Sequence, residues 1–185
     1  MELILEFIST IDRSLVYFIQ SVGPILKPVA WFLSNGLGYT IMLPLFVLGL
    51  FLIRRHRIAI ELTLITCVTG GIVLVLKHIF QASRPYMIDP HVIAYATDSD
   101  FGLPSGHASL SMVILGWIAL RHPKSTILTW GSPVLIVLIG LSRIYLGVHY
   151  PSQVIAGWLL GGLVIFIFYS INKRLWRPFQ KSFER

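Results

Sequence analysis

The sequence is poor in charge and has a single cysteine. Charged residues make up 12% of its 185 residues and hydrophobic residues 55%, whereas roughly a quarter of an average soluble protein is charged. This composition excludes an ordinary soluble domain and indicates an integral membrane protein. Cys67 lies in an apolar run, so we expect a buried thiol and no internal disulfide. The acids Glu2, Glu6 and Asp12 argue against a cleavable signal peptide, which begins with basic residues.

An internal repeat, a low-complexity tract and a second compositional unit are also absent, so we expect one domain over residues 1–185. A helix needs about 20 apolar residues to span a bilayer. Six segments fit and predict an all-α membrane bundle of six transmembrane helices over residues 14–33, 37–53, 58–80, 105–121, 125–145 and 152–171. The first is interrupted by Pro24 and Pro28, so it is either kinked or begins earlier, within the amphipathic stretch from Leu3 to Phe7.

Positive charge gathers at alternate ends of these predicted spans. Basic residues follow the second, fourth and sixth spans: Arg54, Arg55, Arg57, Arg121, Lys124, Lys173, Arg174, Arg177, Lys181 and Arg185. Short cytoplasmic loops carry such an excess, so we expect this face and both termini to be cytoplasmic. The net charge of +7 is then mainly a sign of topology, which makes nucleic-acid binding a minor interpretation. A polar loop over residues 81–104 covers the opposite, outer face.

Three polar clusters fall on that outer face: Lys77 with Arg84-Pro85, Pro104-Ser105-Gly106-His107, and Ser142-Arg143 with His149. Charges beside hydrocarbon are costly and are retained mainly where they function. Lys77 and Arg84 alone fit snorkelling side chains. Arg143 reaches the same depth from another helix, so the three cations need a counter-anion. Phosphate fits this need, and the competing partners are the loop acids Asp89, Asp98 and Asp100.

The second and third clusters add groups suited to phosphoryl transfer. Ser105 and Gly106 open the fourth span, where free helix amides favour an anion, although taken alone they fit a serine N-cap better. His107, in the first turn, is suited to protonate a leaving oxygen. His149 is suited to attack phosphorus and form a phosphohistidine, a scheme that needs no metal. The remaining histidines are expected to be ordinary interfacial residues: His56, His78, His91 and His122.

In order and internal spacing, Lys77-x6-Arg84-Pro85, Pro104-Ser105-Gly106-His107 and Ser142-Arg143-x5-His149 resemble the signature motifs of the type 2 phosphatidic acid phosphatase superfamily. The resemblance covers about residues 77–153. It implies a six-helix membrane phosphatase without a cofactor, with His149 as nucleophile and His107 as proton donor. It also implies a phosphate-binding set of Lys77, Arg84, Ser105, Gly106 and Arg143.

The sequence departs from this family at Gln153, where the third motif has an aspartate that orients the nucleophile and stabilises its positive charge. Gln153 lies one helical turn from His149, so its amide oxygen can accept the Nδ1 proton but carries no charge. Three interpretations stay open: a loop acid such as Asp98 or Asp100 replaces the carboxylate, the enzyme is slow, or the position was altered deliberately. A gain of activity in Gln153→Asp would show that the carboxylate is missing rather than replaced.

We therefore expect a lipid phosphatase of the bacterial inner membrane, with its site on the periplasmic or extracellular side. The resemblance implies a membrane lipid substrate such as lipid A 1-phosphate, phosphatidylglycerophosphate or undecaprenyl pyrophosphate, and the sequence does not choose among them. Tyr86, Tyr95 and Phe101 either line the headgroup pocket or are interfacial aromatics. The alternatives are a lipid phosphotransferase with the same intermediate and a non-catalytic phospholipid-binding or transport protein. The sequence sets no oligomeric state.

Overall fold

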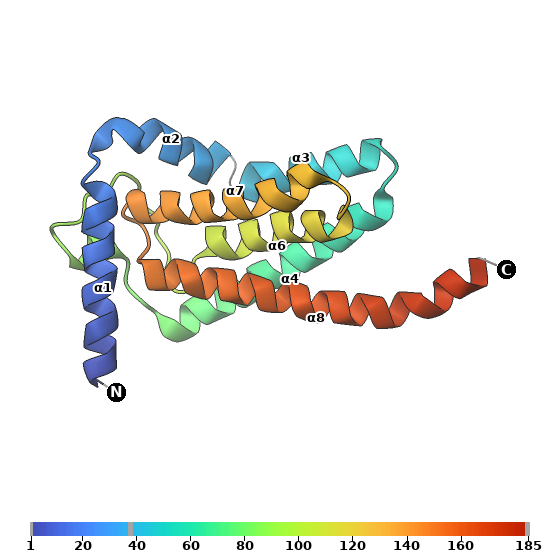
Figure 1. Cartoon of the computed structure of the whole chain (residues 1–185). Coiled ribbons are helices and arrows are strands. Elements are labelled where there is room, and N and C mark those ends of the chain that lie inside the picture. Colours follow the sequence, from blue (N-terminus) through green and yellow to red (C-terminus); the bar gives the residue numbers. More distant parts are fainter. Residues whose placement is uncertain (1, 37–38, 184–185) are drawn as a thin grey trace.

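The computed structural model describes residues 2–36 and 39–183, and every regular element in this part of the chain is a helix. The elements are α1 (Glu2–Gln20), η1 (Pro24–Leu26), α2 (Lys27–Trp31), η2 (Phe32–Gly36), α3 (Tyr39–Leu52), α4 (His56–Phe80), α5 (Pro85–Ile88), α6 (Gly106–Arg121), α7 (Thr126–Tyr145) and α8 (Pro151–Phe183). Figure 1 shows α3, α4, α6, α7 and α8 as a bundle, with α1 crossing one end. The predicted all-α class is confirmed.

Helix α6 lies inside the bundle and packs against α4, α7 and α8 (Figure 1). Its Val113, Ile114 and Trp117 are fully buried and form a core with Leu62 of α4 and Ile139 of α7. The outer faces of the surrounding helices expose large apolar side chains, among them Leu64, Val68, Val75, Val134, Leu159 and Phe166. An apolar exterior of this extent suits a lipid bilayer rather than water.

Two glycines bring α8 close to α6. A Cβ atom at Gly157 would lie 2.6 Å from the Ser105 carbonyl oxygen, and one at Gly161 would lie 2.7 Å from the Ser109 carbonyl oxygen. Small residues one turn apart let membrane helices approach at backbone distance. This contact holds the start of α6 against the first turns of α8.

Three described helices are long and apolar enough to cross a membrane by themselves: His56–Ile88, Thr126–Tyr145 and Pro151–Ile171. They coincide with the third, fifth and sixth predicted spans. Helix α6 has 16 residues, a length of about 24 Å, and the apolar part of α3 covers only Leu43–Leu52. The number of six spans therefore stays a prediction. Residues 37 and 38, where the second span was expected to begin, lie outside the described residues.

The first predicted span, residues 14–33, is bent in the structure and is not one continuous helix. The segments Glu6–Gln20 and Pro24–Gly36 are bent by 79° relative to each other. Gly23 has a φ of 75° and precedes Pro24, which has no N–H to continue the helix, so the bend falls between them. The alternatives of a kink and an earlier start are both present in the structure.

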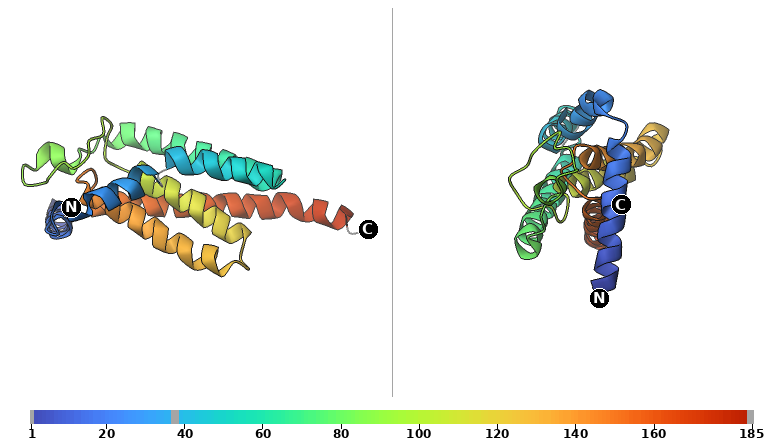
Figure 2. Two further views of the ribbon diagram at one scale, coloured as in Figure 1. Left: turned by 90° about the horizontal axis from the view of Figure 1, so that it is seen from above. Right: turned by 90° about the vertical axis from the view of Figure 1, so that its left-hand side faces the viewer.

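The start of α1 and the end of α8 lie at opposite ends of the bundle (Figure 2). The structure therefore does not support the prediction that both termini share one face, because α1 turns across the bundle end instead of passing through it. The basic connections after α3 and after α6 lie at the end far from α1, as the alternating charge predicted (Figure 1).

Cys67 is exposed on α4, so the expected buried thiol is wrong. Its neighbours Ile65, Thr66 and Thr69 face the core instead. Lipid chains and a protein core are equally apolar, so an apolar run in a membrane helix does not reveal which face is buried.

Candidate functional site

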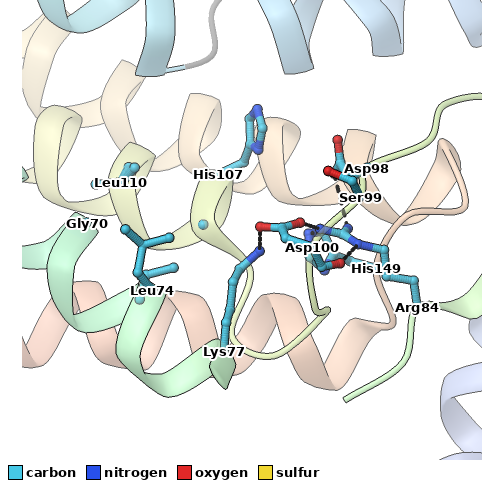
Figure 3. Close-up of a pocket in the computed structure, with 12 residues that line it drawn as sticks. Gly70, Leu74, Lys77, Arg84, Asp98, Ser99, Asp100, His107, Leu110 and His149 are labelled. Atoms are coloured by element: carbon cyan, nitrogen blue, oxygen red, sulfur yellow. Dashed lines mark hydrogen bonds and ion pairs between the residues drawn. The ribbon is translucent and has the colours of Figure 1, made fainter. Parts of the chain in front are cut away.

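A cavity of about 400 Å³ lies at the end of the bundle crossed by α1, where α4 ends and α6 begins. Its polar wall consists of Lys77, Arg84, Asp98, Ser99, Asp100, Gly106, His107 and His149, and its apolar wall of Gly70, Val73, Leu74 and Leu110. Figure 3 shows the apolar group on one side of Lys77 and the charged group on the other. Two walls of opposite character therefore meet at the end of α4.

Two of the three predicted cations, Lys77 and Arg84, line this cavity, and the third, Arg143, is joined to it by the carboxylate of Asp98, which both arginines bind. Lys77 lies in the last turn of α4, Arg84 directly before α5, and Arg143 in the last turn of α7. All three are buried, with exposed fractions of 5%, 1% and 2%. Buried cations require an anionic partner, because removal from water is costly.

That partner is a pair of loop carboxylates. Asp98 pairs with Arg84 at 3.1 Å and also binds Arg143, and Asp100 binds Lys77 and Arg84. Burial by itself would raise the pKa of Asp100, but its hydrogen bonds to Lys77 and Arg84 and their charges lower it. Of the competing partners named from the sequence, Asp98 and Asp100 therefore occupy the cation site. The third acid, Asp89, lies elsewhere.

Neutral groups fix the orientation of the two arginines. Arg84 donates through Nε to the Asp100 carbonyl at 2.7 Å and through Nη1 to the Val148 carbonyl at 2.8 Å. Arg143 donates through Nη1 to Ser34 Oγ at 2.5 Å. Sequence reasoning did not identify Ser34, which stands 109 residues before its partner; its only signal was the polar Ser34-Asn35-Gly36 break.

The second cluster forms the start of α6. Ser105 is the N-cap, because its Oγ accepts from the Ala108 N–H at 3.5 Å, and the residue is fully buried. Gly106 and His107 line the cavity directly. The first amides of an α-helix have no partner within the helix, so this end favours an anion. The two interpretations of the tetrapeptide, N-cap and anion site, are thus compatible.

His149 lies in the connection between α7 and α8 and is 1% exposed. Its Nε2 lies 3.2 Å from Nη1 of Arg84, and its Nδ1 lies 3.1 Å from Oε1 of Gln153. A guanidinium only donates and an amide oxygen only accepts, so the proton is on Nδ1 and the lone pair is on Nε2. Burial, followed by the charges of Arg143 and Arg84, holds the pKa of His149 well below its ordinary value.

The predicted aromatic residues hold the loop rather than line the cavity. The Tyr86 hydroxyl donates to the Asp98 carbonyl at 2.7 Å and accepts from the Asp98 N–H at 3.3 Å. Tyr95 stacks on Tyr145 with ring centroids 5.2 Å apart, and Phe101 contacts His78 edge-on. These contacts fix the backbone that carries Asp98 and Asp100.

Among the described residues, no group of three or more His, Cys, Asp or Glu side chains is placed to hold a metal ion. The four histidines expected to be ordinary, His56, His78, His91 and His122, are not among the residues that line the cavity. The chemistry of the lining is that of an anion site with two imidazoles.

Comparison with known proteins gives a consistent result. The sequence model of the PAP2 superfamily, the type 2 phosphatidic acid phosphatases, matches residues 58–177. An undecaprenyl-diphosphatase of Sulfolobus acidocaldarius is 34% identical over 65% of this chain, and the match spans 59% of that protein's length. The bacitracin transport permease protein BcrC of Bacillus licheniformis is 33% identical over 84% of this chain and 78% of its own.

A solved structure resembles the whole bundle. The crystal structure of a transmembrane PAP2 type phosphatidylglycerolphosphate phosphatase from Bacillus subtilis superposes with a TM-score of 0.80. It covers 91% of this chain and 88% of its own, at 24% identity. At this identity the likeness shows the fold.

Proposed function

Because the chain belongs to the PAP2 superfamily, we propose that it is an integral membrane lipid phosphatase that removes a phosphate from a phosphomonoester or pyrophosphate lipid. The observation that carries the proposal is the composition of the cavity. Buried cations and two histidines face a space whose other wall is apolar. A phosphorylated lipid suits both walls, because its phosphate can bind the cations and its hydrocarbon can contact the apolar side chains.

In this proposal the phosphate replaces the two loop carboxylates. Lys77, Arg84 and Arg143 transfer their bonds from Asp98 and Asp100 to the phosphate oxygens. The backbone amides of the first two residues of α6 add uncharged donors, and Ser105 contributes by capping that helix. Positioned donors of this kind stabilise the charge that develops during phosphoryl transfer.

In the proposed reaction, His149 is the nucleophile and is regenerated when the phosphohistidine is hydrolysed. The Nε2 lone pair attacks phosphorus, the bond from phosphorus to the lipid or pyrophosphate oxygen breaks, and His107 protonates that oxygen. Water then attacks the phosphohistidine, His107 takes the proton of the water, and inorganic phosphate leaves. Asp98 and Asp100 bind cations, and Nδ1 of His149 binds Gln153. The amide, rather than a loop acid, is therefore the proposed partner of the nucleophile.

The apolar wall supports lateral access of a lipid. Val73 and Leu74 of α4 form this wall together with Leu110 of α6, and Leu74 is 58% exposed on the outer surface of the bundle. A lipid whose headgroup reaches the cations keeps its first methylene groups against this wall. A water-soluble phosphate ester gains nothing from it.

The test is phosphate release by the purified full-length protein from undecaprenyl diphosphate, phosphatidylglycerophosphate and phosphatidic acid. The first two lipids are those acted on by the archaeal relative and the Bacillus neighbour, as their names state. We expect His149→Ala to lose at least about 10³-fold in kcat, and activity to persist in a chelator. His122→Ala is the matched control, because His122 follows the end of α6 that lies away from the cavity, and its Nδ1 bonds the Ile118 carbonyl at 3.0 Å. Equal activity of wild type and His149→Ala would contradict the proposal.

A further inference from the structure

The side chain of Gln153 contacts groups from the first and third polar clusters. It lies in the first turn of α8 and is 5% exposed. Its Nε2 donates to the Ser83 carbonyl at 3.0 Å, directly before Arg84. Its Oε1 accepts from the Tyr150 N–H at 3.2 Å and from His149 Nδ1 at 3.1 Å. Both halves of the amide are therefore used.

The backbone of Gln153 also contacts the second polar cluster. Its carbonyl oxygen accepts from the Ser105 N–H at 3.0 Å. A Cβ atom at Gly102 would lie 2.6 Å from Nε2 and 2.7 Å from Oε1 of Gln153, so a larger residue there would displace the amide. One residue thus joins the segments that carry Arg84, His107 and His149.

We propose that Gln153 is a positioning residue whose neutral amide, both donor and acceptor, sets the tautomer of His149 and ties the three motifs together. The inference rests on the proposed function only in assigning His149 as the nucleophile. An aspartate in its place has no N–H for Ser83 and is one methylene shorter. The site is built for an amide and is not a damaged carboxylate site.

If the site requires an amide at position 153, a charged replacement of Gln153 should lower activity instead of raising it. In Gln153→Glu, one oxygen of the ionised carboxylate would face the Ser83 carbonyl oxygen. Both oxygens only accept hydrogen bonds, so none can form between them. A protonated glutamic acid restores the pattern, because its hydroxyl donates to Ser83 and its carbonyl accepts from Nδ1. Gln153→Glu should therefore reproduce the hydrogen bonds of the amide only at acid pH.

The first experiment compares kcat and KM across pH in wild type, Gln153→Glu and Gln153→Asp. Near pH 8 we expect kcat of both variants to fall by about tenfold or more while KM changes by less than about threefold. Relative to wild type, Gln153→Glu should recover toward pH 5 and Gln153→Asp should not. A gain in kcat for either variant near pH 8 would overturn the proposal.

A second measurement does not depend on turnover. In full-length protein labelled with ¹⁵N-histidine, the signal lost in His149→Ala identifies His149, and long-range ¹H–¹⁵N couplings report its tautomer. We expect a protonated Nδ1 and a bare Nε2 in wild type, and a mixture of tautomers in Gln153→Ala. A proton on Nε2 in wild type would overturn the assignment even if the protein releases phosphate. The expected tautomer in a protein that releases none would leave the positioning role intact and refute the proposed function.

Discussion

At the scale of single residues, the sequence identified the groups of the site but not their partners. Lys77, Arg84, His107 and His149 line one cavity, and Arg143 pairs with Asp98 in its wall. The resemblance that named the family is confirmed by the match over residues 58–177. The roles of these residues stay predictions. The bonds of Arg143 to Ser34 and of Gln153 to Ser83 span 109 and 70 positions. Contacts over such separations depend on helix packing, which no local spacing encodes.

The loop carboxylates predict an effect on substrate affinity. In Asp100→Asn, Lys77 and Arg84 lose an internal competitor for phosphate. We expect the inhibition constant of inorganic phosphate to fall by about tenfold, since a charge-assisted hydrogen bond contributes roughly 1.5 kcal/mol or more. The measurement is product inhibition of phosphate release. The control is Asp89→Asn, because Asp89 bonds Tyr17 at 2.5 Å outside the cavity and should leave the constant unchanged. Weaker inhibition in Asp100→Asn would instead assign Asp100 to holding the cations in place.

The nucleophile predicts the acid limit of activity. Burial and the charges of Arg143 and Arg84 lower the pKa of His149, so the imidazole stays neutral below the ordinary histidine value of about 6.5. The profile of kcat/KM reports groups of the free enzyme. Its acid limb should therefore have a midpoint below about 6.5, with activity lost only as the pH falls through the lowered pKa. A midpoint above that value would contradict the neutral resting state of His149.

At the scale of elements, helices with continuous apolar runs were predictable, whereas in the first segment the interruption was predictable and the size of the bend was not. Helices α4, α6 and α7 begin and end within two residues of the predicted limits. Hydropathy could not give the size of this bend, because it sums apolar residues regardless of direction, and the chain turns by 79° at Gly23-Pro24. The close packing of α6 against α8 was also not predictable from the sequence, because nothing there distinguishes Gly157 and Gly161 from other small residues.

The close contact of α6 and α8 predicts a steric effect. In Gly157→Ala, the new methyl group would lie 2.6 Å from the Ser105 carbonyl and 2.9 Å from Ala108 Cβ, so the helices must separate. We expect a loss of about 1–3 kcal/mol in stability, seen as a lower Tm in detergent, together with reduced turnover. Gly162→Ala is the matched control, because its nearest neighbour is Met112 Cε at 3.5 Å, an ordinary contact. Equal Tm values for the two variants would show that α6 and α8 are not held at this distance.

At the scale of the whole molecule, the separation of charge predicts topology. The cavity and the basic connections lie at opposite ends of the bundle (Figure 1). From this separation, the positive-inside rule predicts that the cavity lies outside the cytoplasm. In a Cys67→Ser background, His91→Cys should react with an impermeant maleimide in intact cells, and Arg55→Cys only after permeabilisation, since both residues are exposed. The reverse pattern would place the site on the cytoplasmic side.

The central claim is that phosphate passes through His149. Full-length protein is mixed with the ³²P-labelled lipid that it hydrolyses fastest and is quenched in alkali, in which phosphohistidine survives, and then exposed to acid, in which it does not. The account predicts label on the wild-type chain that is stable in alkali, lost in acid and absent from His149→Ala. Equal labelling of the two proteins, or rapid hydrolysis by wild type without any label, would contradict it.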